Sequence, residues 1–194
     1  MRTIGTITRL QIQRGSLKRG EKPTRHYDPT PLLSVAALNV SPDGALGASP
    51  GDGESWIVDV HHRAHPRTKN EDGLHGISIG FTSHYAAMRE HFGDRLEVGC
   101  AGENIIAKVD RRFSYEDLAS GVAIVAPDGT ERVRLKVLQV AHPCRPFTGW
   151  ALGKTVEPEE LKEHLQFLDN GMRGFYCVGE GIGTVKLGDS VAIV

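Results

Sequence analysis

The sequence predicts a mainly β protein, folded as a barrel or a sandwich, on two observations. Its apolar stretches are short, rich in Val and Ile, and separated by Gly, Asp and Pro, a texture typical of strands joined by tight turns. Many short strands at this spacing favour a barrel or a sandwich over a parallel α/β sheet. The first strands are expected at residues 3–13, 33–40 and 56–60.

Later in the chain, two pairs of strands are expected to form hairpins. Residues 122–126 and 133–140 are joined by a segment that contains Asp128-Gly129, and this dipeptide readily supplies the positive φ angle of a tight turn. Residues 183–187 and 190–194 are joined by Gly188-Asp189 in the same way.

Two short surface helices are expected to interrupt the strands. Residues 83–92 begin with Ser83 as an N-cap and are followed by Gly93. The segment Pro158–Leu168 begins with Pro at the first position, followed by two Glu residues that suit a helix N-terminus. Its leucines recur at i, i+4 and i+7 and should face the core: Leu161, Leu165 and Leu168. Residues 14–31 and 41–54, rich in Pro, Gly and charge, are expected to be long surface loops.

Length and composition restrict the class of protein. The chain has 194 residues, 39% of them hydrophobic and 24% charged, which suits one globular domain over residues 1–194. A net charge of −1 gives no global field that would gather nucleic acid. The absence of a long apolar run or of a signal-like N-terminus predicts neither a membrane span nor export. Three cysteines without CxxC spacing favour a reducing cytoplasm over a disulfide framework.

Cys144 is the sharpest candidate for chemistry. It follows the expected strand 133–140 and lies between Pro143 and Pro146, which restrict the backbone on both sides. His142 and Arg145 are near in sequence, and a neighbouring cation favours the thiolate. A thiolate can act as a nucleophile, a sulfur carrier or a soft metal ligand. The alternative is a half-buried cysteine in a proline-rich turn without a function.

A glycine turn at residues 99–104 is the second candidate. Glycines there let the backbone approach a ligand or bend sharply. Glu103 and Asn104 would then orient a ligand, or brace a neighbouring loop. Cys100 precedes this turn, whereas Cys177 is expected in a strand core.

Histidines cluster in Asp59-Val60-His61-His62-Arg63-Ala64-His65. His61 and His65 would share one face and could bind a metal, but no HExxH pattern and no further ligand group accompany them. His61, His62 and Arg63 could equally contact an anionic group. Basic residues of the first long loop, which are usually solvated, are further candidates for phosphate contact, and Arg173 lies beside a flexible turn from which it could reach a pocket. The basic residues of that loop are Arg14, Lys18, Arg19, Lys22 and Arg25.

Taken together, these motifs resemble the MOSC domain family, named for the C-terminal region of molybdenum cofactor sulfurase. Gly102-Glu103-Asn104-Ile105 resembles the family's GEN(I/L) signature, and the segment that ends in His142-Pro143-Cys144 resembles its strand leading into a shared cysteine. Residues 173–176 and 183–189 resemble its closing strand and its GxVxxGD hairpin. These matches keep the family's order over about residues 95–194. Residues 59–65 resemble its looser Asp/His/Arg segment.

This resemblance implies a closed or partly open barrel, related to the pyruvate kinase β-domain, and a pocket for molybdopterin-bound molybdenum. It assigns Cys144 as the molybdenum ligand or sulfur carrier. Basic residues would hold the pterin phosphate, for which Arg is well suited. The candidates for contact with the cofactor are Arg173, Arg145, Arg63, His61, His62, Gly102, Glu103, Asn104 and His142. Many relatives carry Arg two residues before the cysteine, so His142 weakens a cation contact inferred there.

The function expected first is therefore a molybdenum-cofactor protein of the stand-alone bacterial type, which reduces N-hydroxylated compounds. Because no nucleotide-binding glycine motif follows a strand, the electrons must come from a separate redox partner. The chain has no room for a pyridoxal-phosphate sulfurase domain. A sulfur carrier through a Cys144 persulfide, fed by a sulfur donor protein, is the first alternative. A non-catalytic binding module, with a metal at His61 and His65, is the second.

Overall fold

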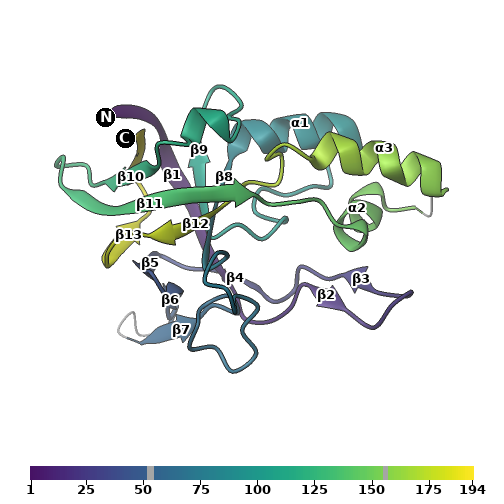
Figure 1. The fold of residues 1–194 in the computed structure, drawn as a ribbon, viewed down its shortest axis with the longest axis horizontal. Helices are drawn as coiled ribbons and strands as arrows, with labels where there is room; N and C mark the ends of the chain where they lie inside the picture. Colours follow the sequence, from purple (N-terminus) through teal and green to yellow (C-terminus); the bar gives the residue numbers. More distant parts are fainter. Residues whose placement is uncertain (52–54, 155–156) are drawn as a thin grey trace.

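The computed structural model describes residues 1–51, 55–154 and 157–194 and confirms a mainly β fold built around a closed barrel (Figure 1). Neighbouring strands pair in the order β1, β14, β10, β11, β12, β8 and β9, and β9 pairs again with β1, which closes the ring. These strands are β1 (Arg2–Gln13), β8 (Ile77–Phe81), β9 (Ile105–Lys108), β10 (Val122–Val125), β11 (Glu131–Val140), β12 (Phe175–Gly179) and β14 (Ser190–Ile193).

Strand β1 pairs with three neighbours in turn, because it is 12 residues long and its register shifts along its length. Its register shifts between Thr3 and Gly5 and again between Ile7 and Arg9. The first half pairs with β14, the middle with β9, and the last residues with β4 (Leu32–Ser34). At Gly5 the backbone of β9 approaches so closely that a Cβ would meet the Lys108 carbonyl oxygen at 2.3 Å. The last residues of β1 pair with β4 outside the barrel, and Gln13 there lines the pocket described below.

Apolar side chains from every barrel strand fill its interior. Ile79 and Phe81 of β8, Leu135 of β11 and Phe175 of β12 are completely buried. Cys177 of β12 is part of this core, as the sequence predicted. The parallel pair β8 and β9 is connected by helix α1 (Thr82–Phe92), since parallel strands need a crossover.

A second sheet of four strands lies below the barrel in Figure 1, and its pairing differs from several predictions. β13 (Gly183–Lys186) pairs with β5 (Ala37–Ser41), whereas β14 pairs with β10 and β1, so residues 183–194 do not form a hairpin. The predicted strand 33–40 is divided between β4 and β5. β6 (Gly44–Ala48) lies within the predicted loop 41–54, of which residues 52–54 lie outside the described part. The predicted strand 56–60 ends early, as β7 (Trp56–Val58).

The predicted loop 14–31 also contains structure. β2 (Lys18–Arg19) and β3 (His26–Tyr27) form a short antiparallel pair, and Leu17 and Tyr27 are buried. Apolar burial against the helices holds this segment in place, which its polar composition concealed. By contrast, the hairpin of β10 and β11 forms as predicted.

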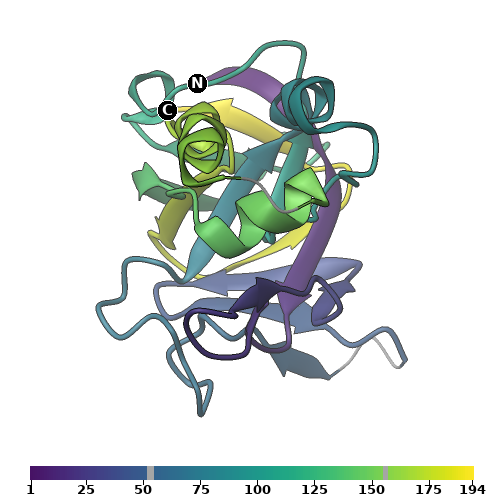
Figure 2. The same ribbon diagram turned by 90° about the vertical axis from the view of Figure 1, so that its right-hand side faces the viewer.

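Helices α1, α2 (Arg145–Leu152) and α3 (Pro158–Leu168) lie together at one end of the barrel (Figure 2). α2 was not predicted, because Pro146 and Gly149 are poor helix formers in an eight-residue segment. α1 ends at Gly93 as expected, but its N-cap is Phe81, and the Ser83 hydroxyl donates to the Arg111 carbonyl oxygen instead. In α3 only Leu168 of the predicted leucines is fully buried among the described residues. None of the described helices is long and apolar enough to cross a membrane.

Candidate functional site

Cys144 is the residue that precedes α2, and this position fixes its thiol. Its backbone is extended, with φ −138° and ψ 143°, and its carbonyl oxygen accepts hydrogen bonds from the backbone nitrogen and the hydroxyl of Thr148, both at 3.0 Å. The next turn is anchored by Phe147, which is completely buried. The thiol is half-buried and lies at a helix N-terminus, where the backbone dipole favours negative charge.

The Arg173 guanidinium contacts this sulfur. One of its terminal nitrogens, Nη1, lies 3.7 Å from Cys144 Sγ and 3.2 Å from the His142 carbonyl oxygen. The other, Nη2, donates to the Ala101 carbonyl oxygen at 3.2 Å, and the guanidinium lies 4.3 Å from the centre of the Phe147 ring. Burial works against its charge, but negative charge on Cys144 and the surrounding Tyr and Glu side chains raises the Arg173 pKa on balance. The contacts hold the guanidinium between two backbone segments and the sulfur.

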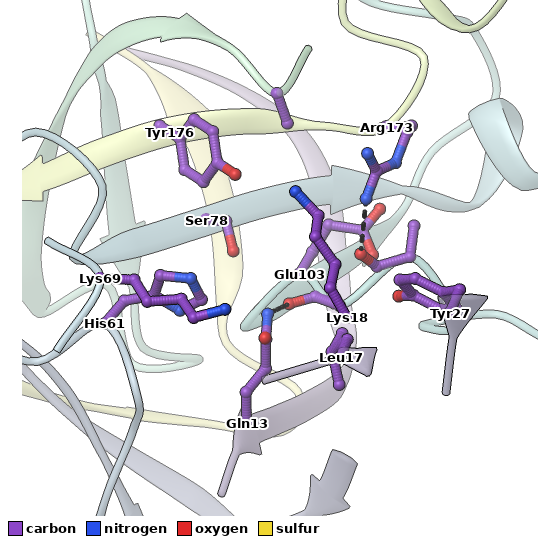
Figure 3. Close-up of a pocket in the computed structure, with 13 residues that line it drawn as sticks. Gln13, Leu17, Lys18, Tyr27, His61, Lys69, Ser78, Glu103, Arg173 and Tyr176 are labelled. Carbon is purple, nitrogen blue, oxygen red and sulfur yellow. Dashed lines mark hydrogen bonds between the residues drawn. The ribbon is translucent and has the colours of Figure 1, made fainter. Parts of the chain in front are cut away.

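Arg173 also lines a pocket (Figure 3). Its cavity volume is about 100 Å³, smaller than the roughly 300–1,000 Å³ of typical small-molecule sites. The lining comes from β1, the β2–β3 segment, the loop after β7, β8, the glycine turn, the residue after β11, and β12 with the turn before it. The lining residues are Gln13, Leu17, Lys18, Tyr27, His61, Lys69, Ser78, Ala101, Gly102, Glu103, Ala141, Arg173 and Tyr176. Cys144 is not among them, and Arg173 is the lining residue that contacts its sulfur.

Cations dominate the mouth of this pocket. Lys18 extends toward its centre in Figure 3, and Lys69 also lines it. The Lys69 ammonium donates to the Ser16 hydroxyl at 2.5 Å. Burial, followed by the positive charges of Lys18 and Arg25, lowers the pKa of Lys69. Like charges brought together in this way create a site that an anion would stabilise.

His61 is oriented by the buried carboxylate of Asp59. Asp59 Oδ1 accepts from the His61 backbone nitrogen at 2.8 Å and lies 3.1 Å from His61 Nδ1. Asp59 Oδ2 accepts from the Gln13 backbone nitrogen at 2.7 Å. Asp59 is completely buried, so its oxygens are occupied by the protein, while the imidazole of His61 borders the pocket.

The predicted turn of Gly102, Glu103 and Asn104 divides into lining and bracing residues. Gly102 lines the pocket at φ 99°, and a Cβ there would meet Gln13 Nε2 and Leu17 Cδ1, both at 2.8 Å. Glu103 also reaches the lining. It accepts the Tyr85 hydroxyl proton at 2.5 Å, and burial raises its pKa.

Asn104 is a brace and does not line the pocket. Its Oδ1 accepts from the backbone nitrogen and the hydroxyl of Ser78 at 3.0 and 3.1 Å. Its Nδ2 donates to the Gln11 carbonyl oxygen at 3.2 Å and to Asp59 Oδ2 at 3.0 Å. The side chain thus joins β8, β1 and the Asp59 turn, which is the bracing alternative of the sequence analysis.

Other predicted site residues point elsewhere. His62 Nδ1 accepts from the backbone nitrogen of Ala64, and the Arg63 guanidinium lies 3.8 Å from Asp43. The His142 side chain is 68% exposed and faces Asp169, although its carbonyl oxygen binds Arg173. Arg145 is exposed to solvent. Among the described residues, no group of three His, Cys, Asp or Glu side chains is arranged to hold a metal ion.

Several lining residues were missed by the sequence analysis. Gln13, Ser78 and Tyr176 lie within strands, and Lys69 lies in a polar loop. Tyr176 is three residues after Arg173, and its place in the closing motif was the available signal. Nothing in the sequence near Lys69 distinguishes it from a solvated lysine.

The fold and the site define a β-barrel protein with a half-buried thiol at a helix N-terminus and a pocket lined by cations. A family model for the MOSC domain matches residues 75–192, more than half of the chain, and the chain therefore belongs to the MOSC domain family. The match begins after β1 to β7, yet β1 of the preceding segment is a barrel strand and carries Gln13 of the pocket.

Solved structures with a similar fold include the YUAD protein from Bacillus subtilis. It is 15% identical, the alignment covers 98% of this chain and 96% of that one, and the TM-score is 0.60. YiiM from Geobacillus stearothermophilus is also 15% identical, with coverage of 100% of this chain and 74% of that one and a TM-score of 0.51. At these identities the likeness shows the fold alone. A search of curated protein sequences found no match.

Proposed function

We propose that this protein binds the molybdenum cofactor, with Cys144 as the molybdenum ligand, and reduces N-hydroxylated compounds with electrons from an external donor. Membership of the MOSC family supports the choice of cofactor. The single observation that carries the proposal is the position of Arg173, 3.7 Å from the Cys144 sulfur and at the wall of a cationic pocket. One guanidinium thus connects a soft metal ligand with a site for an anionic group.

The side chains present suit the thiol-binding and phosphate-binding parts of such a cofactor, but the cavity of about 100 Å³ is too small to hold the whole group without rearrangement. A thiolate is a soft ligand of the kind that binds soft metals, and Lys18 and Lys69 offer ammonium groups to a phosphate. Arg173 Nε is buried and has no hydrogen-bond partner among the described residues, so it retains a donor for a ligand. Gly102 leaves backbone in direct reach of the pocket. Because Cys144 does not line the pocket, a cofactor held there would contact the sulfur only after nearby side chains move.

Bound molybdenum would supply two-electron redox chemistry at Cys144. The chain's own residues bind and orient: Lys18 and Lys69 hold the phosphate, and Arg173 balances negative charge near the sulfur. Asp59 orients the His61 imidazole at the pocket wall. The N-hydroxylated small molecule would enter through the same mouth, and the electron donor is a separate protein. Nucleic acid and membranes are not expected partners.

The decisive experiment measures molybdenum and pterin in protein purified from a host that makes the cofactor. Wild type is expected to carry close to one molybdenum per chain, and Cys144→Ser at least about tenfold less, since a hydroxyl is a poor soft ligand. Cys100→Ala is the matched control and should load like wild type. Wild-type protein without molybdenum, or equal loading of Cys144→Ser, would refute the proposal.

A sulfur carrier is the second candidate, favoured by one specific observation. The Cys144 sulfur is half-buried and outside the pocket lining, at a helix N-terminus beside a cation, which suits a persulfide that a donor protein loads. Cyanide-releasable sulfur on wild type, but not on Cys144→Ser, would support this role. A non-catalytic module on the same fold would show neither sulfur nor molybdenum.

Two further expectations belong to the same proposal. We propose a location in a reducing cytoplasm, which the cysteine spacing of the sequence supports; the cysteines that the structure describes are free thiols. The organisation of residues 1–194 as one domain stays a prediction, which limited proteolysis of the purified chain would test.

A further inference from the structure

We propose that a basic groove next to the pocket is a second binding site, which takes the phosphate chain of a small polyphosphate ligand. The groove is lined by residues at the end of β1, in the β2–β3 segment, before β4 and in the loop after β7. This inference stands apart from the proposed function, because it needs neither molybdenum nor Cys144. The cations of the basic groove are Arg14, Lys18, Arg19 and Arg67.

Positive charge in the groove is largely uncompensated. Four of the described lining side chains are cationic and none is a carboxylate. Within the described part of the chain, Arg19 alone among the four has an ion-pair partner, since its Nε lies 3.2 Å from Asp28 Oδ2. The whole chain carries a net charge of −1, so this concentration of cations is local. Cations held close together repel one another, and a bound anion relieves that repulsion.

Two side chains connect the groove with the pocket of Figure 3. Lys18 lines both cavities. Ser16 lines the groove, and its hydroxyl accepts a hydrogen bond from the Lys69 ammonium, which lines the pocket. Burial, followed by the positive charges of Lys18 and Arg25, lowers the pKa of Lys69, which agrees with crowded positive charge at this junction. A chain of phosphate groups in the groove can therefore also reach the ammonium groups at the pocket.

The backbone holds the groove in an ordered shape. Leu17 and Tyr27 are buried, which anchors the β2–β3 segment on both strands. The Asp28 backbone nitrogen donates to the Leu17 carbonyl oxygen at 2.8 Å, and the Arg14 backbone nitrogen donates to the Pro31 carbonyl oxygen at 3.0 Å. Because these contacts already fix the backbone, a ligand has less conformational freedom to remove when it binds.

The size and the chemistry of the groove favour a small polyanion. Its cavity volume is about 540 Å³, within the range of small-molecule sites. Arginine forks and the Lys18 ammonium are suited to phosphate oxygens. The described lining contains no aromatic side chain on which a nucleobase would stack. The groove therefore recognises the phosphates of inorganic triphosphate or of a nucleoside triphosphate, and its concave shape suits such a ligand better than a flat acidic protein face.

Calorimetric titration of the purified chain with sodium triphosphate at low salt tests the site. Arg14→Met and Arg67→Met are each expected to weaken binding about tenfold, because each removes a charge-assisted contact. Arg63→Met is the matched control: it removes a cation from the same loop as Arg67, but one that lies beside Asp43 and outside the groove. Its affinity should equal that of wild type. These side chains are exposed, so the variants should fold normally.

Asp28→Asn tests the charge argument in the opposite direction. It removes the carboxylate beside Arg19, while the amide oxygen can still accept the Thr30 backbone proton that Asp28 Oδ1 accepts. Triphosphate should bind this variant about two- to fivefold more tightly, the effect of one exposed ion pair. An affinity equal to or weaker than that of wild type would contradict a site in which Arg19 binds the anion.

Competing ligands identify which group is recognised. Adenosine triphosphate should bind within about threefold of inorganic triphosphate, because the base finds no aromatic partner. Nucleotide binding more than about tenfold tighter would assign the groove to the base. A poly-glutamate peptide that binds more tightly than triphosphate, and is weakened in Arg14→Met and Arg67→Met, would assign it to an acidic protein. Either result would overturn the inference, as would no triphosphate binding at roughly 1 mM or an equal loss in Arg63→Met.

Discussion

Asn104 Nδ2 donates to the buried Asp59 Oδ2 over 3.0 Å, so that one amide connects the glycine turn to the residue that orients His61. Asn104→Ala would leave the Gln11 carbonyl oxygen and both Ser78 donors without this partner. Because unsatisfied buried polar groups cost about 1–3 kcal/mol each, we expect a loss of about 2–4 kcal/mol in the free energy of unfolding. Urea denaturation measures this, with exposed Gln166→Ala as the control. A loss below about 1 kcal/mol would contradict the bracing role.

Reactivity of the thiols should follow their surroundings. Burial raises the pKa of Cys100 to about 12, and Cys177 is completely buried, so iodoacetamide should label Cys144 first at neutral pH. Arg173→Met should slow that labelling roughly tenfold, because a hydrogen bond to a charged group contributes about 1.5 kcal/mol or more. Arg173→Lys should give an intermediate rate and exposed Arg145→Met the wild-type rate. Peptide mass spectrometry resolves the sites. Equal rates in Arg173→Met and wild type would show that Arg173 does not stabilise the thiolate.

His84 should make the fold sensitive to acid. Its Nε2 accepts the Phe113 backbone proton and its Nδ1 lies 3.0 Å from the Gly171 carbonyl oxygen, so the ring is neutral. Burial lowers the pKa of His84 from 6.5 to about 4, partly opposed by the Gly171 bond. The unfolded chain therefore binds this proton first, and the stability is present above pH 6.5 and lost as pH falls toward 4. The loss attributable to His84 is about 3 kcal/mol.

Denaturation with urea at several pH values between 7 and 4 checks this prediction. In His84→Gln the amide can replace both hydrogen bonds without titrating, so its free energy of unfolding should vary less in that window than that of wild type. Identical slopes for the two proteins would assign the acid sensitivity to other groups.

The lysines at the pocket mouth should bind phosphate before any cofactor is present. Pyrophosphate is titrated into the cofactor-free protein, and NMR shifts around Gly102 report its binding. We expect the affinity for pyrophosphate to fall about tenfold in Lys69→Met and in Lys18→Met, because each substitution removes a charge-assisted contact. Exposed Lys162→Met on α3 is the control. Affinity that is the same in all variants would exclude these lysines as the anion site.

Local signals in the sequence determined the β class, the hairpin of β10 and β11, the prominence of Cys144 and the glycine turn beside Asn104. Turn residues and motifs act over a few positions, so they can be identified without neighbours. Prediction failed where distant segments decide the structure. β13 pairs with β5 and not with β14. Helix α2 forms after Cys144 because Phe147 is buried against Tyr27, which lies far away in the sequence.

Only the tertiary structure decided which charged residues share the pocket. Closing the barrel brings Lys18, Lys69 and Arg173 together, although more than 150 residues separate the first from the last, and it sends Arg63 and His142 outward. The charge of a side chain is a local property of the sequence, but its direction and its neighbours depend on strand register and packing. Those are set by contacts across the whole chain.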